Sequence, residues 1–194
     1  MLARLFTIPV LLLGFAAGPA LAQSGASADA PRGDNTRAQL IRNIQREVLD
    51  YPHYTVYDSV KVQVDGDSVT LLGKVTMPFK KDDLGERVAR VRGVKTLNNQ
   101  LEVLPASKSD DELRVGIANA IYSHPSFDRF TGPDRPIHVI VERGRVTLEG
   151  FVNTEADRLA ALSIARSFGS FAVTDELKTQ AQVRAEQQKK QKKQ

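Results

Sequence analysis

The chain has 194 residues, no cysteine and a formal net charge of +4, so disulfide bonds are excluded and each domain must be held together by burial of its own core. Residues 36–178 carry twenty basic and twenty acidic side chains, whereas residues 179–194 carry five basic side chains and one acidic one. Because the body is balanced and the positive charge lies in the tail, nucleic acid is a poor candidate for a partner.

The first 22 residues have the pattern of a secretory signal peptide. Arg4 precedes an apolar run from residue 5 to residue 17, and the triplet ALA at residues 20–22 fits a cleavage site. The alternative is an uncleaved membrane anchor, but the run is shorter than the roughly 20 apolar residues of a spanning helix. We therefore expect an exported, periplasmic protein, with a disordered linker at residues 23–35.

Residues 36–52 and 109–125 are matching segments. The first opens with Thr-x-x-Gln and the second with Ser-x-x-Glu, which are both capping-box patterns. Apolar residues recur every four positions in the first segment, at Leu40, Ile44 and Val48. An amphipathic helix that ends before a proline is therefore predicted in each segment.

Two β-hairpins are predicted at corresponding places after these helices. The first strands read VKVQV and IHVIV, and short turns that contain glycine follow them. The second strands read VTLLGKV (69–75) and VTLEGFV (146–152), with Gly73 and Gly150 on the same side as the valines. We expect a helix to press on the sheet at both glycines, where a side chain would push it away.

A second helix is predicted in each copy, over residues 80–93 and 154–169. Both segments end on a glycine, Gly93 and Gly169, which is a common helix stop. An extended segment then closes each copy, at residues 95–103 and 172–179. The order αββαβ, present twice, predicts an α+β fold of two tandem domains, each a small three-stranded sheet with two helices packed on one face.

The residues that recur are Val69, Leu71, Gly73, Val75, Gly93, Val94, Asn99 and Leu101 in the first copy and Val146, Leu148, Gly150, Val152, Asp175 and Leu177 in the second. Through these residues the chain resembles the BON domain, a bacterial envelope module often found in tandem in exported proteins linked to osmotic shock. The resemblance implies BON domains at residues 36–104 and 109–179, joined by a linker at 105–108. The second copy departs from the pattern at Gly169-Ser170, where Gly-Val is expected, and at Asp175, which replaces the usual asparagine.

No catalytic or metal-binding set stands out. The histidines do not align between the two copies and no cysteine accompanies them, so we expect no metal and no cofactor. The acidic pairs at residues 82–83 and 110–111 stand at predicted helix starts, where they favour the positive end of the helix dipole. Neighbours in sequence point apart on a helix, unlike a glycosidase pair, so we do not expect an enzyme.

The outward faces of the predicted sheets are interrupted by Leu72, Ile140 and Phe151. Exposed apolar residues on a sheet often mark a contact. The interpretation that we favour is that the two sheets or a linker cover these side chains.

The second copy also has a longer loop, residues 126–136, in which Phe127 and Phe130 stand near Arg129 and Arg135. Aromatic rings beside arginines suit a lipid headgroup interface. The alternative is that both phenylalanines fold back under the loop.

The last segment, residues 180–194, is rich in Gln and Lys and is predicted to be a disordered basic tail. Near an anionic membrane each lysine contributes about 1 kcal/mol, so the tail would be attracted weakly without anchoring the protein. The lysines concerned are Lys189, Lys190, Lys192 and Lys193.

The resemblance to BON proteins implies a non-enzymatic protein that associates with anionic phospholipid membranes and supports envelope integrity or osmotic-stress tolerance. The residues themselves add only the aromatic loop and the basic tail as lipid-binding candidates. Two alternatives stay open: a soluble periplasmic protein-binding or chaperone-like module, and a structural adaptor in an envelope complex. Envelope proteins are therefore also possible partners.

Overall fold

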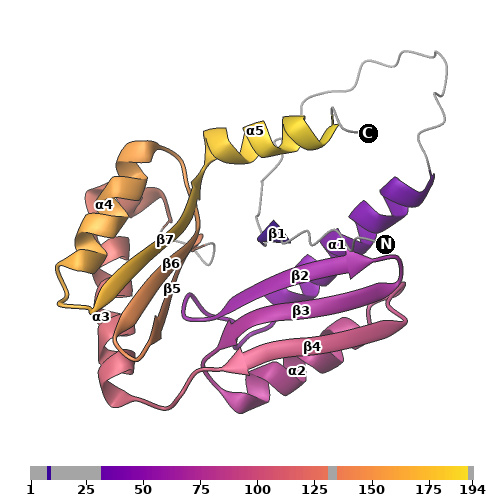
Figure 1. Cartoon of the computed structure of the whole chain (residues 1–194), viewed down its shortest axis with the longest axis horizontal. Helices are drawn as coiled ribbons and strands as arrows, with labels where there is room; N and C mark the ends of the chain where they lie inside the picture. The colour runs from indigo at the N-terminus through magenta and orange to yellow at the C-terminus, as the bar shows by residue number, and fades with distance from the viewer. Residues whose placement is uncertain (1–7, 10–31, 131–134, 192–194) are drawn as a thin grey trace.

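The computed structural model describes residues 8–9, 32–130 and 135–191, which form two domains of the same element order (Figure 1). Most of the expected signal peptide and of the linker at residues 23–35 lies outside these described residues. The end of that linker, from residue 32 onward, belongs to the first helix. No helix within the described ranges is long and apolar enough to cross a membrane.

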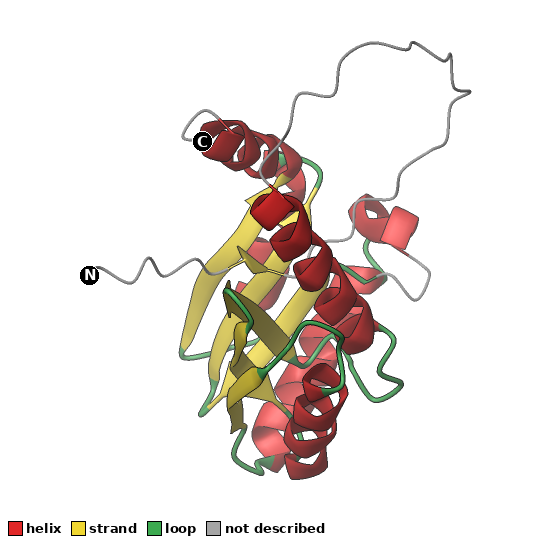
Figure 2. Cartoon of the chain, turned by 90° about the vertical axis from the view of Figure 1, so that its right-hand side faces the viewer, coloured by secondary structure: helices red, strands yellow, loops and turns green. Residues whose placement is uncertain are grey.

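The first domain contains α1 (Arg32–Leu49), β2 (Ser59–Asp65), β3 (Ser68–Val75), α2 (Pro78–Ala89) and β4 (Thr96–Val103). β2 and β3 form an antiparallel hairpin, and β4 lies parallel to β3. The short segment β1 (Ile8–Pro9) pairs antiparallel with the free edge of β2, which makes the sheet order β1-β2-β3-β4. Both helices cover one face of the sheet (Figure 2).

The second domain contains α3 (Lys108–Tyr122), the 3-10 helix η1 (Pro125–Phe130), β5 (Ile137–Glu142), β6 (Arg145–Val152), α4 (Glu155–Arg166) and β7 (Ala172–Thr179). Its sheet has the order β5-β6-β7, again with one antiparallel and one parallel pairing. The prediction of two tandem αββαβ domains is therefore confirmed.

The alternating strand pattern places the valines of both repeated strings in the cores. The side chains of Val69, Leu71 and Val75 in β3 are fully buried, and so are the matching residues of β6, Val146, Leu148 and Val152. The helical residues predicted to face inward, Leu40, Ile44 and Val48, join the first of these clusters. Each domain thus buries the stripe of its helices against the inner face of its own sheet.

Two helix starts differ from the prediction. α1 begins at Arg32, so Thr36 lies inside the helix instead of capping it. The cap of α3 is Ser107, whose side chain accepts a hydrogen bond from Asp110 N, whereas the capping-box pattern placed the cap at Ser109. Serines at 107 and 109 are each followed three residues later by an acidic residue, and the pattern alone does not choose between such registers.

Gly73 and Gly150 are required for a different reason from the one predicted. Their φ angles are 124° and 107°, a region that side chains rarely adopt. A Cβ would lie 2.1 Å from Ser59 O at the first glycine and 1.8 Å from Pro136 O at the second. The obstacle in both copies is the backbone carbonyl where the preceding strand starts, and the expectation that a helix presses there is wrong.

The second helix of each domain ends before its glycine. α2 ends at Ala89 and α4 at Arg166, whereas Gly93 and Gly169 follow later, with φ angles of 105° and 69°. These glycines therefore shape the turn into the last strand, and they do not themselves stop the helices.

The C-terminal segment contains a helix, α5 (Gln180–Gln191), where its composition predicted disorder. Gln, Ala, Lys and Arg are good helix formers. The helix start is also capped reciprocally, because Thr179 N donates to Gln182 Oε1 (2.9 Å) and Gln182 N donates to Thr179 Oγ1 (3.3 Å). Lys189 and Lys190 belong to this helix, and residues 192–193 lie outside the described ranges.

Candidate functional site

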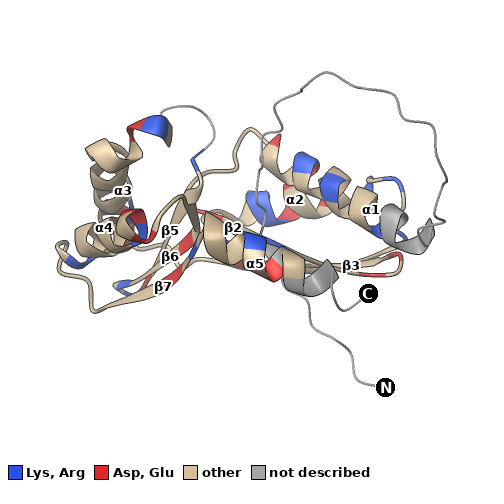
Figure 3. Ribbon diagram, turned by 90° about the horizontal axis from the view of Figure 1, so that it is seen from above, with Lys and Arg blue, Asp and Glu red and all other residues tan. Residues whose placement is uncertain are grey.

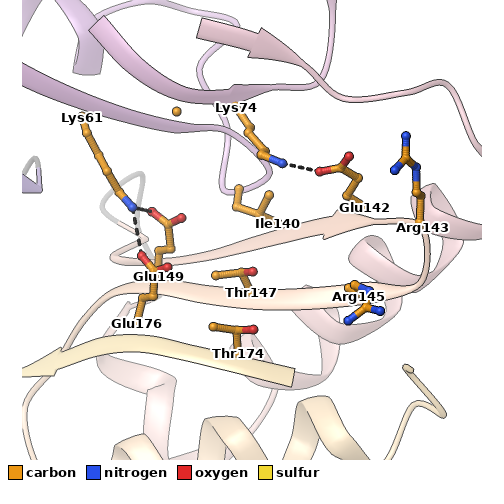
Figure 4. A pocket seen from close by; sticks show the side chains of 11 residues that line it. Lys61, Lys74, Ile140, Glu142, Arg143, Arg145, Thr147, Glu149, Thr174 and Glu176 are labelled. Atoms are coloured by element: carbon orange, nitrogen blue, oxygen red, sulfur yellow. Dashed lines mark hydrogen bonds and ion pairs between the residues drawn. The ribbon is translucent and has the colours of Figure 1, made fainter. Parts of the chain in front are cut away.

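A polar cleft of about 450 Å³ lies between the outward sheet face of the second domain and strands β2 and β3 of the first (Figure 4). The first domain contributes lysines to its walls and the second contributes glutamates, arginines and threonines. The cleft is therefore a charged boundary between the two domains. Its lining is mostly charged and polar, whereas small-molecule pockets are lined mostly by apolar side chains.

Two lysines of the first domain pair with glutamates across this cleft. Lys61 Nζ lies 2.9 Å from Glu176 Oε2 and 3.2 Å from Glu149 Oε2, and Lys74 pairs with Glu142. Burial lowers the pKa of Lys61, but the two glutamates outweigh burial and the pKa is raised. The hydrogen bond from Lys74 holds the pKa of Glu142 below its usual value. These ion pairs link strands β2 and β3 of the first domain to the outward sheet face of the second.

The connection between α1 and β2 runs along the free edge of β5. Val139 N donates to Val56 O (2.7 Å), and His138 Nδ1 lies 2.7 Å from Asp58 O. Val56 and Tyr57 pack against the core of the second domain. Burial lowers the pKa of His138, because an imidazolium is disfavoured away from water. The domains thus share backbone contacts as well as ion pairs.

Asp58 is fully buried and anchors this connection. Its carboxylate accepts hydrogen bonds from Thr55 N (2.9 Å), Thr76 N (2.8 Å) and Lys80 Nζ (2.7 Å). A buried carboxylate needs such a set of donors because an unpaired buried charge is strongly unfavourable. Sequence reasoning missed Asp58. Its only sign in the sequence is an acidic residue two positions before the alternating strand pattern that starts at Val60.

The loop predicted to contact lipid is folded into the second domain. Phe127 has 0% of its surface exposed, and its ring stacks on Phe130 with centroids 6.4 Å apart. Arg129 pairs with Asp157 at 2.5 Å, and the guanidinium of Arg135 lies 5.0 Å from the centre of a tyrosine ring of α3. The expectation that Phe127 enters a membrane is wrong, since insertion would require the core to open. The alternative, in which the loop folds back, describes Phe127.

The outward sheet faces are partly covered. Ile140 is only 4% exposed and lines the cleft between the domains. Leu72 and Phe151 are half-buried, and the ring of Phe151 lies edge-on to Phe130 at 6.3 Å. The favoured interpretation, that these apolar residues are covered, is confirmed for Ile140.

An exposed aromatic surface lies elsewhere, where the β5–β6 turn meets the loop between α4 and β7; we call residues 143–145 and 168–171 the Phe171 turn. Phe171 is 86% exposed and Phe168 39% exposed. Phe171 N donates to Gly144 O (2.9 Å), and its ring lies so close to Gly144 that a Cβ there would come within 2.5 Å of it. The flanking Arg143 and Arg145 are exposed. The turn therefore carries two exposed phenylalanines and two exposed arginines, and the arginines also line the cleft between the domains.

The buried Asp110 holds the Phe171 turn in place. From the first turn of α3, its carboxylate accepts hydrogen bonds from Arg143 N (2.7 Å) and Gly144 N (2.8 Å). Sequence reasoning assigned Asp110 only to the helix dipole, and it missed Phe171 altogether. The one available signal was Gly169-Ser170, the departure from the family pattern directly before Phe171.

The three histidines all make packing or backbone contacts. His53 lies edge-on to Tyr51 and Phe79, with ring centroids 5.6 Å apart in each case, and His124 lies 5.9 Å from Phe127. Within the described ranges there is no group of three or more residues that could hold a metal ion. Basic and acidic residues are intermixed over both domains (Figure 3).

The BON domain profile matches the chain twice, at residues 36–105 and 109–186. The chain belongs to the BON domain family. BON domains are generally non-catalytic, and membership in this family supports a role associated with the cell envelope.

Two solved structures of CdsD, a structural protein of the type III secretion system of Chlamydia trachomatis, are among those similar to this BON protein. The C-terminal domain matches with a TM-score of 0.29 and 17% identity, over 74% of this chain and 66% of that chain. A second CdsD structure matches with a TM-score of 0.28 and 14% identity, over 72% of this chain and 91% of that chain. No curated protein matched.

Proposed function

We propose that this protein is a non-enzymatic, exported BON protein that associates with anionic phospholipid membranes and supports envelope integrity or osmotic-stress tolerance. The lipid class follows from the family resemblance. The observation that carries the proposal is Phe171, a ring 86% exposed beside exposed arginines. This surface takes the role that the sequence assigned to the loop of Phe127.

The chemistry of the Phe171 turn suits a headgroup layer. Phenylalanine rings enter the boundary between headgroups and acyl chains, while arginines bind phosphate oxygens in pairs of hydrogen bonds. Because Asp110 fixes the backbone of Arg143 and Gly144, the turn loses little conformational entropy when it binds. The lysines of residues 189–193 add an attraction that salt screens beyond about 8–10 Å.

The pairing of the cleft glutamates supports a role without catalysis. Glu142, Glu149 and Glu176 each lie against a lysine, whereas a general base must be free to take a proton from a substrate.

Vesicle co-sedimentation tests this proposal, with phosphatidylglycerol-containing vesicles compared with pure phosphatidylcholine. We expect Phe168→Ser with Phe171→Ser to weaken binding to the anionic vesicles at low and at high salt, and removal of residues 180–194 to weaken it mainly at low salt. Leu159→Ser is the matched control, because it removes a side chain that is 55% exposed on α4, outside the turn. A folded double-serine variant that binds as well as the wild type would contradict the proposal.

A further inference from the structure

The first strand of each repeat is an edge strand with three outward-facing positions. In a hairpin closed by a two-residue turn, alternate residues direct their N–H and C=O groups away from the partner strand. From the pairing registers these are Val60, Val62 and Val64 in β2, and Ile137, Val139 and Val141 in β5. The three positions correspond one to one, because they face Gly73, Leu71 and Val69 in β3 and Gly150, Leu148 and Val146 in β6.

Side chains of the same domain lie at the two outer positions. At the first position, Tyr122 Oη donates to Ile137 O (2.7 Å), and Tyr54 of the first domain packs against the core cluster that contains Val60. At the last position, a helix arginine donates to the carbonyl in each copy, Arg37 to Val64 O (2.7 Å) and Arg114 to Val141 O (2.9 Å). These side chains obstruct pairing with other chains at the two ends of each edge, and the middle position lies between them.

Among the described residues, no side chain of the same repeat bonds to the middle position in either copy; an extended segment from elsewhere in the chain fills it. In the second domain Val139 N donates to Val56 O (2.7 Å), so the connection of the first domain occupies that edge. In the first domain Val62 pairs with Ile8 of β1 (Figure 1). Both occupants are β-branched aliphatic residues in an extended segment.

The residue beside Ile8 also fits an added strand. Pro9 stands opposite Lys61, whose N–H and C=O are directed toward β3 by the alternation of the hairpin. A proline has no N–H to donate, and at a position that needs no hydrogen bond this loss has no consequence.

We propose that the middle position of the β2 edge is a docking site for an extended segment of a partner polypeptide, which adds as an antiparallel strand with a β-branched aliphatic residue opposite Val62. The expected signal cleavage after Ala22 removes Ile8 and leaves this position open, whereas Val56 keeps the equivalent position of β5 filled. Because capping side chains flank the site on both sides, the bound segment is short and its affinity modest. The inference is independent of membrane binding.

Amide hydrogen exchange measured by NMR tests the site, with Val139 as an internal control. In the full chain the Val62 amide should be protected, and Ile8→Asp should accelerate its exchange about tenfold, the equivalent of one hydrogen bond. In the chain that starts at Gln23, the Val62 amide should exchange at the accelerated rate. A synthetic peptide of residues 4–12 should restore protection, and the same peptide with Ile8→Asp should not. Val139 should stay protected throughout.

Three results would overturn the proposal. The first is a Val62 amide that exchanges equally fast in the full chain and in its Ile8→Asp variant. The second is a peptide of residues 4–12 that leaves Val62 exchange unchanged. The third is protection of Val62 in the chain from Gln23 that rises with protein concentration, which would assign the edge to a second copy of the chain.

Discussion

The connection between the first helix and the hairpin spans residues 50–58 in the first domain and 123–136 in the second. The two contain prolines at equivalent positions but make different contacts. The shorter one in the first domain reaches outward, and its Val56 and Tyr57 pack on the second domain. In the longer one, Phe127 is fully buried in the core of its own domain. A longer loop does not by itself indicate a binding loop: here the longer connection places an aromatic ring in its own core, and the shorter one contacts the other domain.

An ion pair beside these connections is inverted between the copies, and only the pair of the first domain is buried on both sides. In the first domain Asp58 of the connection pairs with Lys80 of α2. In the second, Arg129 of the connection pairs with Asp157 of α4, at the helix position that matches Lys80. Both copies thus have an ion pair between the connection and the second helix, but the acidic and the basic partner are exchanged between them.

The largest effect is expected at the feature that the two copies share. Gly150→Leu should destabilise the second domain by about 4–6 kcal/mol, because positive-φ strain adds to the clash with the Pro136 carbonyl. Gly73→Leu should do the same to the first domain. Gly169→Leu is the control: it also has a positive φ, but no atom lies within 4 Å of a Cβ there. Chemical denaturation measures all three, and an equal loss at Gly169 would show that strain alone is responsible.

The second largest loss of stability is expected at the buried Phe127 ring of the second domain. Phe127→Ala should lower the free energy of unfolding by about 3–5 kcal/mol, since it leaves a cavity in a closed core. Thermal melting monitored by circular dichroism measures this loss. If the variant melted like the wild type, the ring would not be part of the core and the contrast between the two connections would fail.

Breaking the ion pair between Asp58 and Lys80 tests the connection of the first domain. Asp58→Ala should cost about 3–4 kcal/mol, because it leaves Lys80 buried without a partner. Adding Lys80→Met should recover much of this loss, since the unpaired charge is then gone. A double variant no more stable than Asp58→Ala would show that the lysine charge is not the cause.

A pH dependence of stability is expected at the boundary between the domains. The pKa of His138 is lowered in the folded protein by burial, so the unfolded chain binds the proton more readily. Stability should therefore fall as the pH drops below about 6.5, toward the lowered pKa. His138→Asn keeps a donor for Asp58 O and cannot titrate, so its melting temperature should fall less over the same pH range. Parallel curves for both proteins would exclude His138 as the cause.

Periodicity was enough to predict the repeat, the element order and the inner strand faces, because burial of Val69, Leu71 and Val75 follows from alternation alone. It could not decide the fate of Phe127, since the same loop composition suits an exposed and a folded-back ring. The contact of Val56 with Val139 joins residues from separate repeats, and no local pattern encodes such a pairing. Phe171 was missed because it follows a turn whose path depends on Asp110, far away in sequence.

The central claim, that the Phe171 turn and not the loop of Phe127 meets the membrane, can be tested by fluorescence. The chain has no tryptophan, so Phe171→Trp introduces a single reporter, and Leu159→Trp places one at an exposed site outside the turn. On addition of phosphatidylglycerol vesicles, emission from the residue at 171 should shift to the blue, while emission at 159 should not move. If the protein sediments with the vesicles but the emission at 171 stays that of a ring in water, the account is contradicted.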